Sequence, residues 1–381
     1  MPTSTEPAVS TGSARASQSA FASTDLPNMD FMRAVAVLLV LFGHLTYFLG
    51  RTNFGPLRTV SMGDMGVKIF FVHTCFVLML SLERQWKGQP VAELFGTFMV
   101  RRIFRIYPLS ICVILLVVAF RLPMATLNPG QFAGIPIHPG LIVSNLLLIQ
   151  SSTNSILGPT WSLPYEMAMY LFLPWLFFLL YPNKSYWRVG AFWLLSVFAC
   201  LGFFAYMGGR PSNNFLLYIP CFLPGVIAYQ LQRVQRRQLS AVVWPGVVIG
   251  VVLLYLWSQN LVSSPWTKGW IACLVLGASS PFFSQLSARW LTEPSRLIAK
   301  YSYGIYLTHF FSIWLGFDRL HNVLPRAARL SLFAALVVLL PIAFYYLLEE
   351  PMIRLGKRIA KRFESDNNSQ RLRFFVDPAG V

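Results

Sequence analysis

Long apolar segments alternate with short, charge-bearing turns along most of the chain. A helix needs about 20 mostly apolar residues to cross a bilayer. The apolar stretch 140–150 is too short for this, but ten other segments are candidates: 31–50, 66–83, 103–121, 165–182, 187–207, 213–231, 241–258, 267–286, 300–317 and 328–349. The pattern therefore predicts an all-α fold, a polytopic membrane bundle with about ten transmembrane helices.

The segments outside the apolar region have a different composition. Residues 1–27 are rich in Ser, Thr, Ala and Pro and lack hydrophobic periodicity, which predicts a disordered tail. Residues 28–355 would form the membrane domain, and residues 356–381 a basic tail. No separate signal peptide precedes the first span, so we expect this span to stay in the protein.

Lys and Arg residues concentrate in alternate turns, which predicts the orientation of the bundle. The turn 84–105 holds five of them, whereas the long loop 122–164 holds none. The positive-inside rule then places both termini in the cytoplasm. The loop with Arg319, Arg326 and Arg329 goes against this trend.

The overall composition excludes an ordinary soluble protein. Only 12% of residues are charged and 55% are hydrophobic, whereas soluble domains carry about 25% charged residues. The net charge of +17 is explained by topology signals in short loops, so we expect membrane lipid rather than nucleic acid as a partner. The five cysteines lie in or beside apolar spans without C-x-x-C spacing, which predicts neither a disulfide framework nor a metal site.

The first span carries two ionisable residues on one face. Arg33 and His44 are eleven residues apart, about 16 Å along a helix and about 20° from a whole number of turns. Ionisable groups inside a membrane helix usually face a bundle interior or a wet cavity and mark a site. The alternatives are that Arg33 only anchors the helix at the interface and that His44 is a hydrogen-bonded core histidine.

Glu166 is the one acid placed to act on His44. It opens the fourth predicted span, on the outer side toward which His44 points. A carboxylate that orients an imidazole makes an effective general base, so His44 and Glu166 are the candidate catalytic residues. The alternative is an acid favoured by the positive end of the helix dipole.

Arg101, Arg102 and Arg105 form a dense cluster at the predicted cytoplasmic edge of the third span. Guanidinium groups bind phosphate bidentately, which makes this cluster, with Arg33, a candidate site for a phosphate-bearing ligand. The alternative is an interfacial anchor or a contact with anionic lipid.

Several short motifs follow one another along the chain. They are D-x-x-R-x(10)-H at Asp30, Arg33 and His44; G-V-x-I-F-F from Gly66 to Phe71; R-R-x-x-R-I-Y-P from Arg101 to Pro108; W-S-L-x-x-E from Trp161 to Glu166; F-L-P-G from Phe222 to Gly225; S-Y-G-I-Y-L-T-H from Ser302 to His309; and E-P at Glu350 and Pro351. Each motif is weak alone. Together, in this order over residues 28–355, they resemble the acyltransferase 3 family of bacterial polytopic O-acyltransferases.

The resemblance implies an O-acyltransferase of the inner (plasma) membrane. The donor would be acyl-CoA, usually acetyl-CoA, entering from the cytoplasm without a metal. The acceptor would be a hydroxyl of a polysaccharide, a lipid-linked glycan or a small molecule. Carried over by position, His44 matches the family's essential histidine, Glu166 its motif glutamate and Arg33 the arginine paired with the histidine, while Arg101, Arg102 and Arg105 fall in the donor-linked arginine motif.

The chain departs from the family pattern in the second span. Where the family usually has Ser and Gly, three and four residues after Phe71, this chain has Thr74 and Cys75. We expect this change to affect close helix approach or passage of the thioester and to narrow the range of donors. His73, beside the change, is either packed in the core or lines a cavity, and His309 in the ninth span is first interpreted as a hydrogen-bonded bundle residue.

Two other function classes remain open at this point. A glycan or lipid transporter or flippase could line its path with Arg33 and His44, although no internal repeat typical of such folds is visible. An inactive family member that serves as an assembly partner would fit the altered Thr74 and Cys75.

Overall fold

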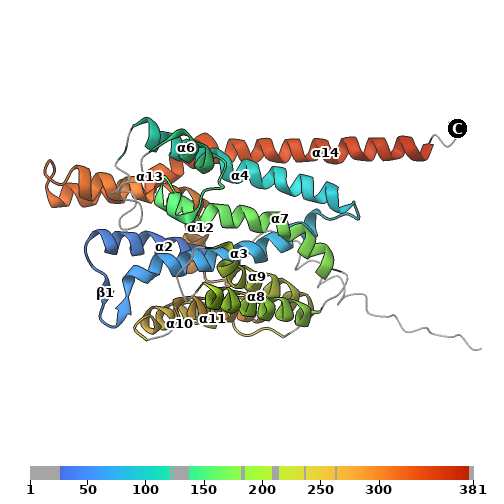
Figure 1. The fold of residues 1–381 in the computed structure, drawn as a ribbon, viewed down its shortest axis with the longest axis horizontal. Helices are drawn as coiled ribbons and strands as arrows, with labels where there is room; N and C mark the ends of the chain where they lie inside the picture. Colours follow the sequence, from blue (N-terminus) through green and yellow to red (C-terminus); the bar gives the residue numbers. More distant parts are fainter. Residues whose placement is uncertain are drawn as a thin grey trace, which may run out of the picture.

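The computed structural model describes residues 26–120, 122, 137–181, 185–207, 214–235, 237–261 and 264–376, so the predicted tail 1–27 lies almost wholly outside it. Apart from one short hairpin and an isolated bridge between Leu239 and Phe283, the regular secondary structure of the described chain is helical (Figure 1). The helices are α2 (Pro27–Phe48), α3 (Met62–Gln85), α4 (Val91–Ala119), α6 (Pro139–Leu146), α7 (Leu163–Leu180), α8 (Tyr186–Tyr206), α9 (Ile219–Val234), α10 (Val243–Ser258), α11 (Pro265–Ser279), α12 (Arg289–Ile313), α13 (Arg326–Phe344) and α14 (Glu350–Val376). The hairpin pairs β1 (Asn53–Phe54) with β2 (Leu57–Arg58) in antiparallel register.

Short 3-10 and π-helical turns connect or extend these helices. The 3-10 turns are η1 (Thr59–Ser61), η2 (Ser152–Asn154), η3 (Gly158–Ser162), η4 (Phe215–Tyr218) and η5 (Ser280–Phe282), and the π-helical turns are η6 (Trp314–Arg319) and η7 (Tyr345–Glu349). Through η7, α13 runs on into α14, and Figure 1 shows α14 projecting beyond the rest of the bundle. The predicted boundary at residue 356 therefore falls inside a helix.

The all-α membrane bundle is confirmed, but the predicted count of ten spans is not. Seven helical segments of the described chain are long and apolar enough to cross a membrane. The predicted spans 241–258 and 267–286 form α10 and α11, whose 16 and 15 residues rise only about 24 Å, less than a hydrocarbon core of about 30 Å. The span predicted at 300–317 begins inside α12, a helix that carries several charged residues in its first half.

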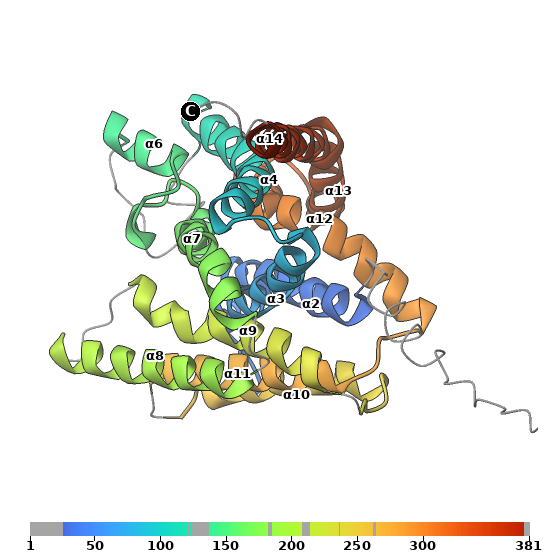
Figure 2. The same cartoon turned by 90° about the vertical axis from the view of Figure 1, so that its right-hand side faces the viewer.

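Helix α3 is the centre of the bundle. Of its most apolar window, 78% is buried inside the protein, against 6% for the window in α13 and α14. Figure 2, which looks along the bundle, shows α3 surrounded by α2, α4, α7, α9 and α12, with α8, α10 and α11 forming a layer on one side. Residues on several faces of α3 therefore contact different helices, and one of these faces lines the site described below.

Two glycines let the neighbouring helices approach α3 closely. A Cβ at Gly66 would lie 2.5 Å from the Ala36 carbonyl oxygen of α2, and a Cβ at Gly225 of α9 would overlap the Val72 carbonyl and lie 2.8 Å from Cβ of Cys75. Because the glycine is on the α9 side of this contact, Cys75 does not prevent the close approach.

Candidate active site

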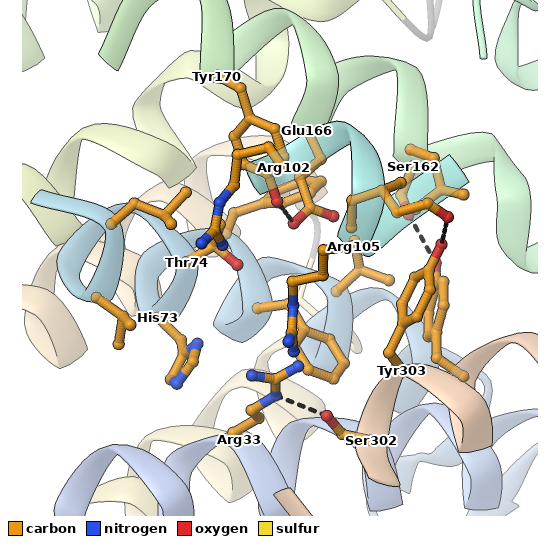
Figure 3. A pocket seen from close by; sticks show the side chains of 18 residues that line it. Arg33, His73, Thr74, Arg102, Arg105, Ser162, Glu166, Tyr170, Ser302 and Tyr303 are labelled. Atoms are coloured by element: carbon orange, nitrogen blue, oxygen red, sulfur yellow. Dashed lines mark hydrogen bonds between the residues drawn. The ribbon is translucent and has the colours of Figure 1, made fainter. Parts of the chain in front are cut away.

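A cavity of about 700 Å³, counting the part open to the outside, lies between α2, α3, α4, α7 and α12. Its walls combine aromatic and aliphatic side chains with several polar groups that point inward (Figure 3). Concave, mostly apolar sites with a few convergent polar groups are the usual form of a ligand or substrate site.

Three of the four predicted arginines converge on this cavity. Arg33 lies on α2, and its Nε donates a hydrogen bond of 2.6 Å to Oγ of Ser302 on α12. Arg102 and Arg105 are three residues apart on one face of α4 and both line the cavity, whereas Arg101 does not. Within the described residues, neither Arg102 nor Arg105 makes a hydrogen bond or an ion pair, and Nε of Arg102 is buried. Two guanidinium groups are thus left with their donors unused.

Glu166 lines the same cavity but does not contact His44. On α7, its carboxylate accepts a hydrogen bond from the Tyr170 hydroxyl one turn later, and the cations that act on it are Arg33, Arg105 and Arg102. The prediction that Glu166 orients His44 is therefore wrong in this structure. The reason is geometric: Glu166 faces the arginine end of the cavity, whereas His44 lies eleven residues beyond Arg33 along α2.

His44 is paired with another histidine instead. Its Nδ1 lies 3.1 Å from Nε2 of His309 on α12, and the two rings stack with their centroids 5.1 Å apart. Nδ1 of His309 lies 3.1 Å from the Ile305 carbonyl oxygen. The Phe310 ring packs against both imidazoles at 4.7 Å.

This hydrogen-bond chain fixes the tautomers of the neutral histidines. A carbonyl oxygen only accepts, so Nδ1 of His309 must carry its proton, and a neutral imidazole has only one N–H. Nε2 of His309 therefore accepts from Nδ1 of His44. It follows that Nε2 of His44 carries a lone pair, the form that a general base requires.

Tyr306 connects the cavity wall to the histidine pair, and Phe70 packs against it. Phe70 and Tyr306 line the cavity and pack edge to face at 5.9 Å, and the Tyr306 ring lies 6.4 Å from that of His309. The Tyr306 hydroxyl lies 2.7 Å from Oγ of Ser162 and 2.8 Å from the Pro159 carbonyl oxygen, both in η3. His44 and His309 themselves do not line the cavity.

The structure distinguishes the two other intramembrane histidines considered above. His73 lines the cavity and is not merely a packed core residue. His309 is a hydrogen-bonded bundle residue, as first interpreted, but its partner is the candidate base itself. The sequence signal for His309 was its position inside a span, since intramembrane ionisable residues are functional candidates by default.

Comparison with known proteins agrees with this architecture. The sequence profile of a family described as an acyltransferase domain, acyltransferase 3, matches residues 26–347 and so includes every residue of the cavity and the histidine pair. The chain belongs to the acyltransferase 3 family. It is a multi-pass membrane protein of that family, with helices long and apolar enough to cross the bilayer.

Two curated relatives show how far the likeness extends. Acyltransferase MdmB of Streptomyces mycarofaciens is 30% identical over 60% of this chain and 62% of its own length. Peptidoglycan O-acetyltransferase OatA of Listeria monocytogenes serovar 1/2a is 26% identical over 87% of this chain and 56% of its own length. The chain thus spans little more than half the length of these relatives. No solved structure matches it significantly.

Proposed function

We propose that this protein is an O-acyltransferase of the inner membrane that moves an acyl group, in the simplest case acetyl, from acyl-CoA to an acceptor hydroxyl. The acceptor would belong to a polysaccharide, a lipid-linked glycan or a small molecule. One observation carries the proposal: a cavity with unpaired guanidiniums lies in the same helix bundle as a histidine whose Nε2 is free to accept a proton. One relative is named an O-acetyltransferase, which supports oxygen as the nucleophile.

The arginine end of the cavity suits the phosphates of the donor. Arg102 and Arg105 offer donors that no described residue uses. Arg33 is held at Nε by Ser302, and its terminal nitrogens likewise bond no residue in the described ranges. Buried polar groups normally find partners, so unused donors in a cavity indicate a ligand. Guanidiniums and phosphate oxygens form charge-assisted, often bidentate hydrogen bonds. Arg101 faces elsewhere and has no part in this proposal.

Glu166 has a structural role in this scheme. Its charge lies among Arg33, Arg102 and Arg105, so it offsets part of the repulsion among three guanidiniums in a site of low dielectric constant. Its hydrogen bond from Tyr170 fixes the carboxylate on the cavity wall. We therefore assign Glu166 to the positioning of the arginines and not to the orientation of His44.

The histidine pair would perform the chemistry. Nε2 of His44 takes the proton of the acceptor hydroxyl as its oxygen attacks the thioester carbonyl, and the C–S bond then breaks. The imidazolium returns the proton to the departing thiolate, which leaves an ester and free CoA thiol. His309 accepts the hydrogen bond from Nδ1 of His44 throughout, which keeps the base in the required tautomer.

The donor would enter at the arginine end with both termini in the cytoplasm, as the charge distribution of the loops favours. From Arg33 to His44 the distance along α2 is about 16 Å, a length that suits an extended pantetheine arm. The arm must pass Phe70 and Tyr306 to bring the thioester to His44. This ring pair would therefore have to rotate or separate during each transfer.

Purified protein in lipid nanodiscs with radiolabelled acetyl-CoA tests the proposal. We expect transfer or hydrolysis of the label, and a loss of about 10²- to 10⁴-fold in His44→Ala, the usual range for a general base. His321→Ala is the matched control, because His321 is an exposed residue whose ring bonds only its neighbour Asn322 among described residues. Equal turnover in wild type and His44→Ala would overturn the assignment, and no turnover in wild type would favour a transporter or an inactive assembly partner.

A further inference from the structure

His73 is a buried imidazole without a hydrogen-bond partner in the described part of the chain. It lies in the middle of α3, its exposed fraction is 5%, and it lines the cavity. Figure 3 shows its ring pointing into the space that the guanidiniums of Arg33 and Arg105 also enter. Because the ring reaches the cavity and no described residue bonds its nitrogens, they are available to a ligand held there.

The position of His73 along the bundle is close to that of Arg33. Gly66 abuts Ala36 and Val40 of the antiparallel α2, and His73 lies seven residues farther on the same face of α3, about 10 Å along the axis. Along α2 in the same direction, Arg33 lies about 5 to 10 Å beyond these two contacts. Arg33 and Arg105 are also the two charged residues that act on His73.

The residues around His73 indicate which kind of ligand it would bind. Two guanidiniums beside an imidazole favour an anion, and an imidazole N–H is a hydrogen-bond donor like those of arginine. A phosphate oxygen between Arg33, Arg105 and His73 would satisfy all three side chains. The cavity continues from here toward Val67 and Tyr306, in the direction of the histidine pair.

We propose that His73 donates a hydrogen bond to the donor phosphate that is attached to the pantetheine arm. This assignment rests on the proposed function, because it takes acyl-CoA as the donor. The phosphate at this depth is the one joined to the arm, because about 16 Å of α2 remain between Arg33 and His44 for the arm to span.

Donors of decreasing length test the assignment. Acetyl-CoA, S-acetyl-4′-phosphopantetheine and S-acetylpantetheine are compared as substrates of wild type, His73→Leu and His73→Gln. Loss of a hydrogen bond to a charged group corresponds to about 10- to 100-fold. We expect His73→Leu to raise KM by this factor for the two phosphate-bearing donors and to leave KM for S-acetylpantetheine unchanged, with kcat little affected. His73→Gln, whose amide can donate, should recover part of the loss.

Three results overturn the assignment. Equal KM in His73→Leu and wild type would show that His73 does not contact the donor. An equal penalty for all three donors would show a structural role or a contact with the arm itself. A penalty for acetyl-CoA alone would place the contact at the distal phosphates. In each of these cases wild type still uses acetyl-CoA, whereas no turnover of any donor by wild type would reject the proposed function itself. Size-exclusion chromatography and thermal unfolding of each variant check its folding.

Discussion

Replacement of His309 by leucine tests the tautomer chain behind the proposed base. The substitution removes the acceptor of the 3.1 Å hydrogen bond from Nδ1 of His44 and keeps an apolar side chain against Phe310. In the resting enzyme this bond joins two neutral rings and is worth about 0.5 to 1.5 kcal/mol, but in the transition state His44 is charged and the bond is worth about 1.5 to 3 kcal/mol. The difference, about 1 to 1.5 kcal/mol, corresponds to a loss of roughly 5- to 13-fold in kcat.

The assay is steady-state acetyl transfer or hydrolysis with acetyl-CoA in nanodiscs. We expect kcat to fall and the donor KM to stay the same in His309→Leu, since His309 does not line the donor cavity. His309→Gln is the matched control, because the oxygen of its amide can accept from Nδ1 of His44 and should restore part of kcat. If kcat is unchanged in His309→Leu, or falls equally in both variants, the tautomer argument is refuted.

Two further substitutions test other parts of the structure. Arg105→Gln removes a guanidinium from the cavity and should raise the KM for acetyl-CoA by about 10- to 100-fold. Arg296→Gln is the control, because Arg296 lies at an exposed ion pair with Glu293, and it should leave this KM unchanged. Equal KM values in the two variants would contradict the phosphate site. Gly225→Ala places a methyl group against the Val72 carbonyl and should destabilise the bundle by about 1 to 3 kcal/mol, seen as a lower Tm. In Gly250→Ala, the added Cβ meets nothing within 4 Å and alanine favours the helix, so the Tm should stay the same or rise slightly. A wild-type Tm for Gly225→Ala would disprove the close α3–α9 contact.

The membrane bundle could be predicted from the sequence because the lengths of apolar runs are a local property. The error in the number of spans has a physical cause, since apolarity alone does not show where a helix ends. Helices α10 and α11 end after 16 and 15 residues, although the apolar composition continues into the flanking turns. A stretch such as 267–286 therefore looked long enough to cross the membrane but is interrupted by η5.

The arginine part of the site was also accessible from the sequence, but the partner of His44 was not. Arg33, Arg102 and Arg105 could be grouped because guanidiniums at a helix end favour one kind of ligand. The contact between His44 and His309 joins residues 265 positions apart, and it depends on how α2 and α12 cross. Helix spacing places two residues on one face only within a single helix, so it gave no basis for choosing between Glu166 and His309.

The contact between the Phe70 and Tyr306 rings also bears on proton movement within the bundle. Polar side chains line the cavity on one side of Tyr306, and the imidazole of His309, paired with His44, packs near its ring. A ring edge packed against a ring face leaves no hydrogen-bonded row of water along which protons could hop. Proton transfer between the cavity and the histidine pair past this contact would therefore require the two rings to move apart.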